Sequence, residues 1–349
     1  NVPSARWSLL NRTLMFLSGT ADARGFHQWH QANRYVKRGA KAFFILVPMA
    51  YYIQEMTVRL GAVTKRGHAE AIFDGFGSFW GWFSIIDLAV VNWLTLITEY
   101  IGMTAAMSIF GIPPFITCIV VTIVLMAVVI TGKYWTFERI TLFFCCFNFV
   151  YIPAAFWAMK SGSAPPWSEV FRGFYYPYFP GGLTTDLIFI LMANIGTTIT
   201  PWQIFFQQSA VVDKGIDIKD IKFGKIDTFA GAFLTCLVAV FIIIATGAAF
   251  YYHHPSIVVE DARQTAEAIV PLMPDGKGSW ARVLFAIGLF DAGFLGALCI
   301  SLSTSWAVGE VFGWAHSLNK GVRDAPWFYF IYLMILVTAG AVVLVPGAP

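Results

Sequence analysis

The sequence predicts an all-α protein that crosses a membrane several times. Of its 349 residues, 58% are hydrophobic and 12% are charged, whereas an average soluble domain carries about 25% charged residues. Seven apolar windows reach or approach the length of about 20 residues that a helix needs to cross a bilayer core, and an eighth is interrupted. So few charges would not cover the surface of a soluble chain of this size. The net charge of +3, without a basic stripe, excludes nucleic-acid binding as the main role.

The apolar windows alternate with short polar loops. The seven uninterrupted windows are Ala42–Thr57, Phe79–Ile101, Pro113–Thr131, Ile140–Met159, Ile226–Tyr252, Val283–Phe312 and Trp327–Val345. The eighth, Leu187–Val212, contains a stretch rich in glycine, threonine and proline. A further apolar stretch, Trp7–Leu17, is followed by the polar run Arg24–Lys41, which a lipid-exposed helix would not tolerate.

The basic residues predict the orientation of the chain. If the loop 59–68 lies inside the cell, alternation of the spans places eleven lysines and arginines in inner loops and five in outer loops. This bias follows the positive-inside rule. The five cysteines, which lack metal-site spacing, are expected to be small buried hydrophobic residues; they are Cys118, Cys145, Cys146, Cys236 and Cys299.

The interrupted window is the most informative part of the sequence. Between Ala193 and Gln203 it contains one glycine, three threonines and Pro201. Proline removes a backbone donor and clashes with the preceding turn, so the helix is expected to break here. A kink is common in membrane helices, but a kink does not need three hydroxyl groups. Discontinuous helices with freed carbonyls form the binding sites of secondary transporters.

Several segments resemble one family of transporters. The segment Gln54–Thr64 resembles the end of the second helix of the Nramp superfamily of divalent-metal transporters, and Thr98–Gly102 resembles its third helix. The broken segment resembles its sixth helix, and Leu284–Glu310 and Phe328–Pro346 resemble its eighth and ninth. The resemblance implies a LeuT-like inverted-repeat fold with discontinuous helices, here truncated after about the ninth helix.

One departure from the family pattern concerns the metal. Where ordinary members have Met-Pro-His, this chain has Thr200-Pro201-Trp202, which resembles the Nramp-related magnesium transporters. A thioether favours softer transition metals, whereas hydroxyl and carbonyl oxygens suit Mg²⁺ and Mn²⁺. The resemblance therefore implies Thr200 and the carbonyl of Thr197 as metal ligands, in a roomy pocket for a partly hydrated ion.

Other departures concern protons. Trp202 replaces a histidine linked to proton movement in relatives, and an indole cannot titrate. Leu96 stands where the family has an acid, and the window 328–345 contains no arginine. We therefore expect cation transport without proton coupling. The candidates for the cavity wall or for contacts with the metal's ligands are Trp202, Gln203, Glu99 and Asp291.

Ionisable residues inside spans are costly and are functional candidates by default. Glu55 is one helical turn from Arg59, which favours a structural ion pair. Asp87 is close to the start of its span and could face headgroups. Glu99 could line the cavity or be structural, and Asp291, among small residues, could attract cations or be a satisfied buried aspartate.

The first helix departs most from the family. The resemblance implies an aspartate at an unwound point facing the sixth helix, and Asp22 is the candidate here, although Arg24 would place a positive charge beside the metal. Three explanations stay open for Arg24–Lys41: an altered first helix, a soluble amphipathic arm, or a sequence error. We divide the chain into an N-terminal arm with a degraded or atypical first helix, 1–41, and a transmembrane transporter domain, 42–349.

The expected function is transport of Mg²⁺, and also of Mn²⁺, across the membrane by alternating access, without a resident cofactor. The alternatives are an organic-solute transporter of the same architecture and a transport-dead binding or sensing homologue. An enzyme is not expected, because the spans contain no hydrolase or metalloprotease motif. The expected partners are the metal ion and the lipid bilayer, and the protein is expected to be a monomer in the bacterial inner membrane.

Overall fold

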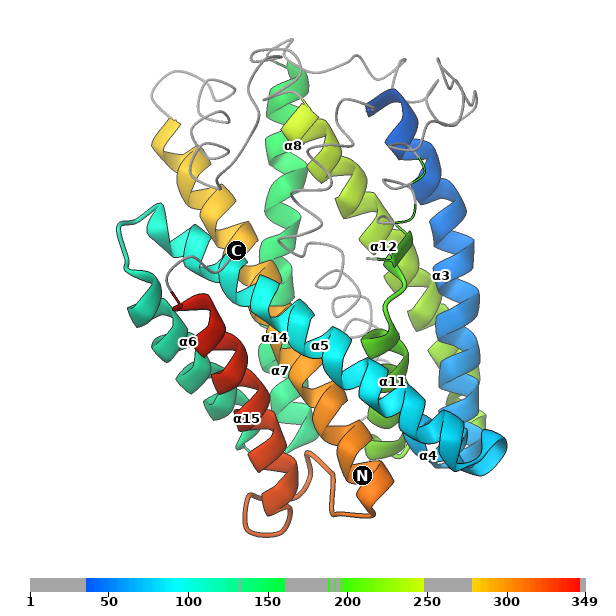
Figure 1. Ribbon diagram of the computed structural model, residues 1–349. Helices are drawn as coiled ribbons and strands as arrows, with labels where there is room; N and C mark the ends of the chain where they lie inside the picture. Colours follow the sequence, from blue (N-terminus) through cyan, green and yellow to red (C-terminus); the bar gives the residue numbers. More distant parts are fainter. Residues whose placement is uncertain are drawn as a thin grey trace.

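The computed structural model describes residues 36–131, 133–160, 198–247 and 278–345, together with Ile188, Met192, Ile195 and Gly196. All regular structure within these ranges is helical (Figure 1). The elements are α3 (Val36–Thr64), α4 (His68–Phe76), α5 (Ser78–Ser108), α6 (Pro114–Val129), α7 (Tyr134–Cys145), the 3₁₀ turn η1 (Cys146–Val150), α8 (Tyr151–Lys160), α11 (Pro201–Asp213), the 3₁₀ turn η2 (Ile218–Asp220), α12 (Ile221–Gly247), α14 (Gly278–Phe312) and α15 (Pro326–Val343).

Each of the seven uninterrupted windows lies largely on helix. Among the described residues, five helical segments are long and apolar enough to cross a membrane, and α6 is a shorter apolar helix. The prediction of an all-helical, multi-pass membrane protein is therefore confirmed. The helix ends differ from the windows where polar residues continue the helix: α3 begins at Val36, before the apolar window, and α7 begins at Tyr134.

Helix α14 is the centre of the described bundle. Of its most apolar window, 78% is buried, compared with 29% to 50% for the other long apolar helices. It packs against α5, α11, α15 and α4, and it lies behind the long diagonal helix α5 in Figure 1. Helices α5 and α14 approach closely at Gly296, where a Cβ atom would lie 2.7 Å from Glu99 Cδ. Small residues on α14 thus allow α5 to come near.

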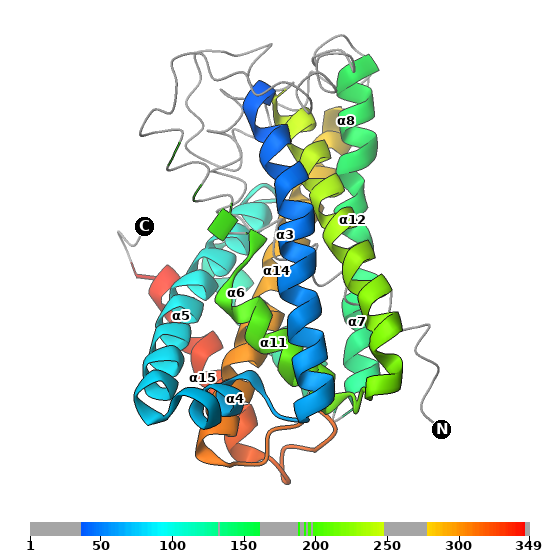
Figure 2. The same cartoon turned by 90° about the vertical axis from the view of Figure 1, so that its right-hand side faces the viewer.

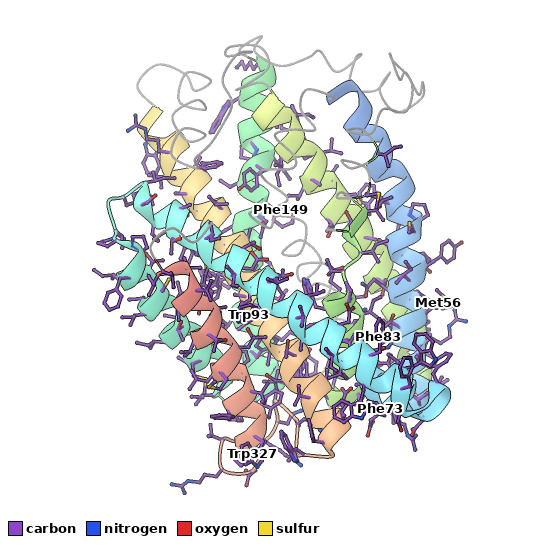
Figure 3. The ribbon with its side chains drawn as sticks, in the orientation of Figure 1. Met56, Phe73, Phe83, Trp93, Phe149 and Trp327 are labelled. Atoms are coloured by element: carbon purple, nitrogen blue, oxygen red, sulfur yellow. The ribbon has the colours of Figure 1, made fainter. Side chains whose placement is uncertain are left out.

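Helices α3 and α12 form a neighbouring pair, side by side in both views (Figures 1 and 2). The rings of Tyr51 and Phe229 meet edge to face, with centroids 5.8 Å apart. On the opposite side of α3, Met56 is 57% exposed and points away from the bundle (Figure 3). An apolar side chain exposed there is suited to contact lipid rather than water.

The window 140–159 was expected to be one helix, and here the structure differs. It is interrupted by η1, whose residue Phe149 is labelled in Figure 3. Pro153, in the first turn of α8, lacks the N–H that would bond the carbonyl of Phe149, which accounts for the interruption. The expectation that all five cysteines are buried was also wrong. Cys146 is exposed at the start of η1, whereas the other four are buried.

Candidate functional site

The structure confirms the helix break ahead of α11. The Ile199 N–H still donates to the Ile195 carbonyl at 3.0 Å, as in a helix. Thr200 then has an extended backbone, with φ −96° and ψ 148°, and Pro201 begins the next helix. Proline is tolerated at this first position because its N–H would have no intrahelical partner. The break therefore follows directly from the Thr-Pro dipeptide.

Two polar groups at the break are buried and lack partners. Gln203 Oε1 accepts a hydrogen bond from the Thr200 N–H at 3.3 Å, which orients the Gln203 side chain back over the break. Thr200 Oγ1 and Gln203 Nε2 have no hydrogen-bond partner among the described residues. A buried hydroxyl and a buried amide without partners each cost free energy, unless a ligand or water satisfies them.

A third unpartnered group comes from α3. Five buried residues, four positions apart, form one stripe along this helix: Leu46, Ala50, Gln54, Val58 and Ala62. Residues at this spacing share a helix face. The contacts of this stripe fix its position, because Ile199 packs against the cluster that contains Ala50, and Val211 belongs to the cluster that contains Val58. Gln54 is one turn from each, so it lies level with the first turns of α11.

Gln54 is the only polar member of that stripe, and both Nε2 and Oε1 lack a partner among the described residues. Gln54 was not among the site residues predicted from the sequence. The sequence shows it in a four-residue period of apolar residues, but that period indicates a buried face only once α11 is placed against α3. Thr200, Gln203 and Gln54 thus bring unsatisfied hydrogen-bonding groups to the interface of α3 and α11.

Trp202 lies on the α14 side of the same turn. Its side chain is buried, and its carbonyl accepts a hydrogen bond from Ser303 Oγ at 3.0 Å. The ring contacts that of Phe206, which in turn contacts Trp306 of α14. The position therefore holds a non-titrating aromatic side chain in an apolar contact, and Ser303 fixes the first turn of α11 against the central helix.

The two acidic candidates have different surroundings. Glu99 is buried against α14 at Gly296, on the α5 side of the bundle. Asp291 is twelve residues before Ser303 on α14, which corresponds to about 18 Å along a helix axis. The Asp291 carboxylate accepts a hydrogen bond from Asn148 Nδ2 at 2.6 Å. The structure therefore does not bring Asp291 to the break at Thr200.

Two implied ligands, Asp22 and Thr197, lie outside the described residues. Within the described ranges, no group of three or more histidine, cysteine, aspartate or glutamate side chains could hold a metal ion. The described part of the site offers a hydroxyl and carboxamides. Such neutral groups are suited to hydrogen-bond the water molecules of a hydrated ion. They are less suited to replace its whole hydration shell.

The far end of α11 is held by buried charges that the sequence pattern did not indicate. Lys214 Nζ lies 3.0 Å from Glu138 Oε1 of α7, and both side chains are nearly inaccessible to solvent. The same ammonium group is 5.1 Å from the centre of the Tyr134 ring. Asp213 accepts hydrogen bonds from the Ser317 hydroxyl and from the Leu318 N–H. Together these contacts tie α11 to α7 and to the loop between α14 and α15.

Helix α4 contacts the same end of α11. Gln208 Nε2 donates to the Arg66 carbonyl at 2.9 Å, which places its Oε1 2.6 Å from His68 Nδ1. Because this oxygen can only accept, Nδ1 of His68 carries the hydrogen. Burial lowers the pKa of His68 below its ordinary value, and the hydrogen bond to Gln208 opposes part of that shift. The predicted ion pair of Glu55 and Arg59 is also confirmed, at 2.6 Å.

Residues 42–349 match the family model described as "Nramp: Natural resistance-associated macrophage protein-like". The chain belongs to the Nramp family. The resemblance seen in the sequence is therefore confirmed at the level of the family, which is one of transporters rather than enzymes.

Individual relatives are more distant. A divalent metal cation transporter, MntH, of Brucella suis is 27% identical over 256 residues, which cover 70% of this chain and 54% of the relative. The metal transporter Nramp1 of Populus trichocarpa is 27% identical over 261 residues, covering 70% of this chain and 46% of the relative. The chain thus spans about half the length of the curated relatives it matches.

The fold is also that of a solved manganese transporter. The manganese transporter of Eremococcus coleocola, in complex with an aromatic bis-isothiourea compound, matches with a TM-score of 0.76 at 17% identity. The match covers 97% of this chain and 71% of that one. This Nramp chain therefore has the LeuT-like, all-helical membrane fold that the resemblance implied.

Proposed function

We propose that this Nramp chain transports divalent metal cations by alternating access, with Mg²⁺ as the preferred ion and Mn²⁺ as a further substrate. Relatives that carry the name of divalent metal cation transporters support the substrate class. The observation that carries the proposal is the buried Thr200 hydroxyl, which has no partner among the described residues and stands at the helix break.

The chemistry of this position favours a hard cation. Thr200 supplies a hydroxyl oxygen where a methionine would supply a thioether, and oxygen ligands suit Mg²⁺ and Mn²⁺. The resemblance adds the carbonyl of Thr197 and the carboxylate of Asp22. Because Mg²⁺ keeps several water molecules in most protein sites, the free groups of Gln54 and Gln203 are suited to hydrogen-bond that water.

The same site supports transport without proton coupling through Trp202. Its indole cannot accept or release a proton, and its backbone carbonyl is engaged by Ser303. The position that would carry a titratable imidazole is occupied by a side chain packed on Phe206. Mg²⁺ flux is then driven by its own gradient and by the membrane potential.

Calorimetric titration of Mg²⁺ and Mn²⁺ into the detergent-solubilised chain tests the site. The Thr200→Met variant is expected to move the ratio of the two affinities toward Mn²⁺ by about tenfold, which is about 1.4 kcal/mol. Thr64→Met, which changes an exposed threonine at the end of α3, is the matched control and is expected to leave the ratio unchanged.

An unchanged ratio in Thr200→Met would remove Thr200 from the coordination sphere. A panel of amino acids titrated in the same way tests the organic-solute alternative, because a transporter of that class would bind one of them and neither metal. Metal binding by the chain without flux in liposomes would contradict transport and favour the binding or sensing homologue.

A further inference from the structure

Asp291 and Asn148 form a buried polar pair between α14 and η1. Their exposed fractions are 1% and 0%, and Asn148 Nδ2 lies 2.6 Å from Asp291 Oδ2. The side chains around the pair are otherwise mostly apolar: Cys145, Tyr151, Val238, Ile242, Ala292 and Leu295 form the adjoining core cluster. A carboxyl group in such surroundings needs a compensating partner, because an isolated buried charge is costly in a membrane protein.

The described residues supply no positive charge for Asp291. None of the ion pairs among them includes this residue. The titratable groups that interact with Asp291 on the packed elements are Cys145 of α7 and Tyr151 of α8. Both are neutral or negative when they titrate, so neither can neutralise a carboxylate.

Two oxygen atoms of this pair need a further hydrogen-bond partner. Asp291 Oδ1 and Asn148 Oδ1 both lack a partner among the described residues. A bound metal ion would need about six oxygen ligands, whereas the two carboxyl oxygens, the amide oxygen and the Tyr151 hydroxyl offer four at most. A proton needs only one oxygen atom that carries it and one acceptor for the hydrogen bond. The Asp291 carboxyl group and the Asn148 amide oxygen provide these two groups.

We propose that Asp291 is a proton-binding site, in which the neutral carboxyl group donates its hydrogen bond to the amide oxygen of Asn148. The amide nitrogen and oxygen of asparagine can exchange places by rotation of the terminal amide, since their positions are assigned from hydrogen bonding. The distance of 2.6 Å between Asp291 Oδ2 and the amide atom assigned as Asn148 Nδ2 is within the range of an O–H···O bond. It is shorter than most N–H···O bonds.

The position of Asn148 gives this proton a structural consequence. Asn148 lies in η1, the 3₁₀ interruption between α7 and α8, and such interruptions often act as hinges. Tyr151 closes the other side, with its hydroxyl 2.6 Å from where a Cβ atom of Gly288 would stand. Loss of the proton places a carboxylate in apolar surroundings and requires the Asn148 amide to rotate, so the protonation state of Asp291 is coupled to the contact between η1 and α14.

Infrared difference spectroscopy on the full chain in detergent tests this site without any transport assay. At neutral pH, the wild type is expected to have one carboxylic-acid C=O band that Asp291→Asn lacks. This band appears in the difference spectrum of the two chains and shifts in D₂O. Asp324→Asn, at an exposed carboxyl group in the loop between α14 and α15, is the matched control and is expected to leave the carboxylic-acid C=O band unchanged. A difference spectrum of Asp291→Asn that contains only carboxylate bands would overturn the proposal.

Asn148→Leu provides a second test if Asp291→Asn does not fold. Removal of the amide acceptor is expected to shift the same C=O band to higher frequency, and an unmoved band would contradict the pairing. The thermal midpoint of the wild type is compared in sodium chloride and choline chloride. A sodium-dependent rise that disappears in Asp291→Asn would mean that a cation, rather than a proton, occupies the site. Failure of metal transport would leave these results unaffected.

Discussion

The carboxylate of Glu310 accepts a hydrogen bond from the hydroxyl of Ser209 at 2.5 Å, which joins α14 to α11. Its second oxygen accepts from the Ala69 N–H at 3.1 Å, in the first turn of α4. Gly67 leaves room for this carboxylate, because a Cβ atom there would overlap the Glu310 carboxyl group. One buried side chain thus holds three helices at the end of the bundle where α11 finishes.

Replacement of Glu310 tests whether this junction stabilises the fold. In Glu310→Leu, both carboxyl oxygens are removed, so the Ala69 N–H and the Ser209 hydroxyl lose their acceptor. The free energy of unfolding in mixed detergent micelles is expected to fall by about 1–3 kcal/mol, the cost of an unsatisfied buried group. Asp324→Asn, at an exposed carboxyl group, is the control. Equal small effects of the two changes would contradict this role of Glu310.

The buried ion pair of Lys214 and Glu138 predicts strong coupling. Lys214→Met leaves the Glu138 carboxylate buried without its cation, and the expected loss of stability is about 3–5 kcal/mol. The double variant Lys214→Met/Glu138→Leu removes both charges and is expected to recover most of that loss. A double variant no more stable than Lys214→Met would show that the pair is not coupled.

An exposed pair provides the comparison. Lys65 Nζ lies 2.6 Å from Asp217 Oδ1, and both side chains are about half exposed. Lys65→Met is therefore expected to cost less than about 1 kcal/mol, because solvent screens exposed pairs. The same equilibrium unfolding measurement serves for both pairs.

The buried environment of His68 predicts a dependence of stability on pH. Its pKa in the folded chain is below the unfolded value of about 6.5. As the pH falls below 6.5, the unfolded chain binds a proton that the folded chain resists, so the free energy of unfolding falls until the folded pKa is passed. Above pH 6.5 both states are neutral and this effect is absent.

His68→Gln isolates that contribution, because a glutamine amide can still donate to Gln208 Oε1. The difference in stability between pH 7 and pH 5 is expected to be smaller in the variant than in the wild type. If both chains lose the same stability on acidification, other groups cause the dependence.

The helices were largely predictable from the sequence because apolar length dominates in a bilayer. The first turns of three helices begin at Pro114, Pro201 and Pro326, since proline is favoured at this position. The break at Thr200-Pro201 was predictable for the same reason. These features depend on local chemistry, which a sequence shows directly.

Contacts between distant segments were less predictable. Glu138 lies just before an apolar window, so its burial depends on the approach of Lys214, 76 residues later. Asn148 gave no local signal that it would meet Asp291, 143 residues away. Gln54 was visible only as the polar member of a buried stripe, and that stripe could be recognised only once α11 was placed against α3.

Uncoupled Mg²⁺ transport is tested by measuring Mg²⁺ uptake into liposomes containing the chain, with the internal pH recorded at the same time. We expect Mg²⁺ to enter without acidification of the lumen. We also expect the ratio of Mg²⁺ entry to Mn²⁺ entry to be lower in Thr200→Met than in the wild type. Acidification in step with Mg²⁺ entry would contradict uncoupled transport, and no Mg²⁺ entry above that of empty liposomes would contradict transport by this chain.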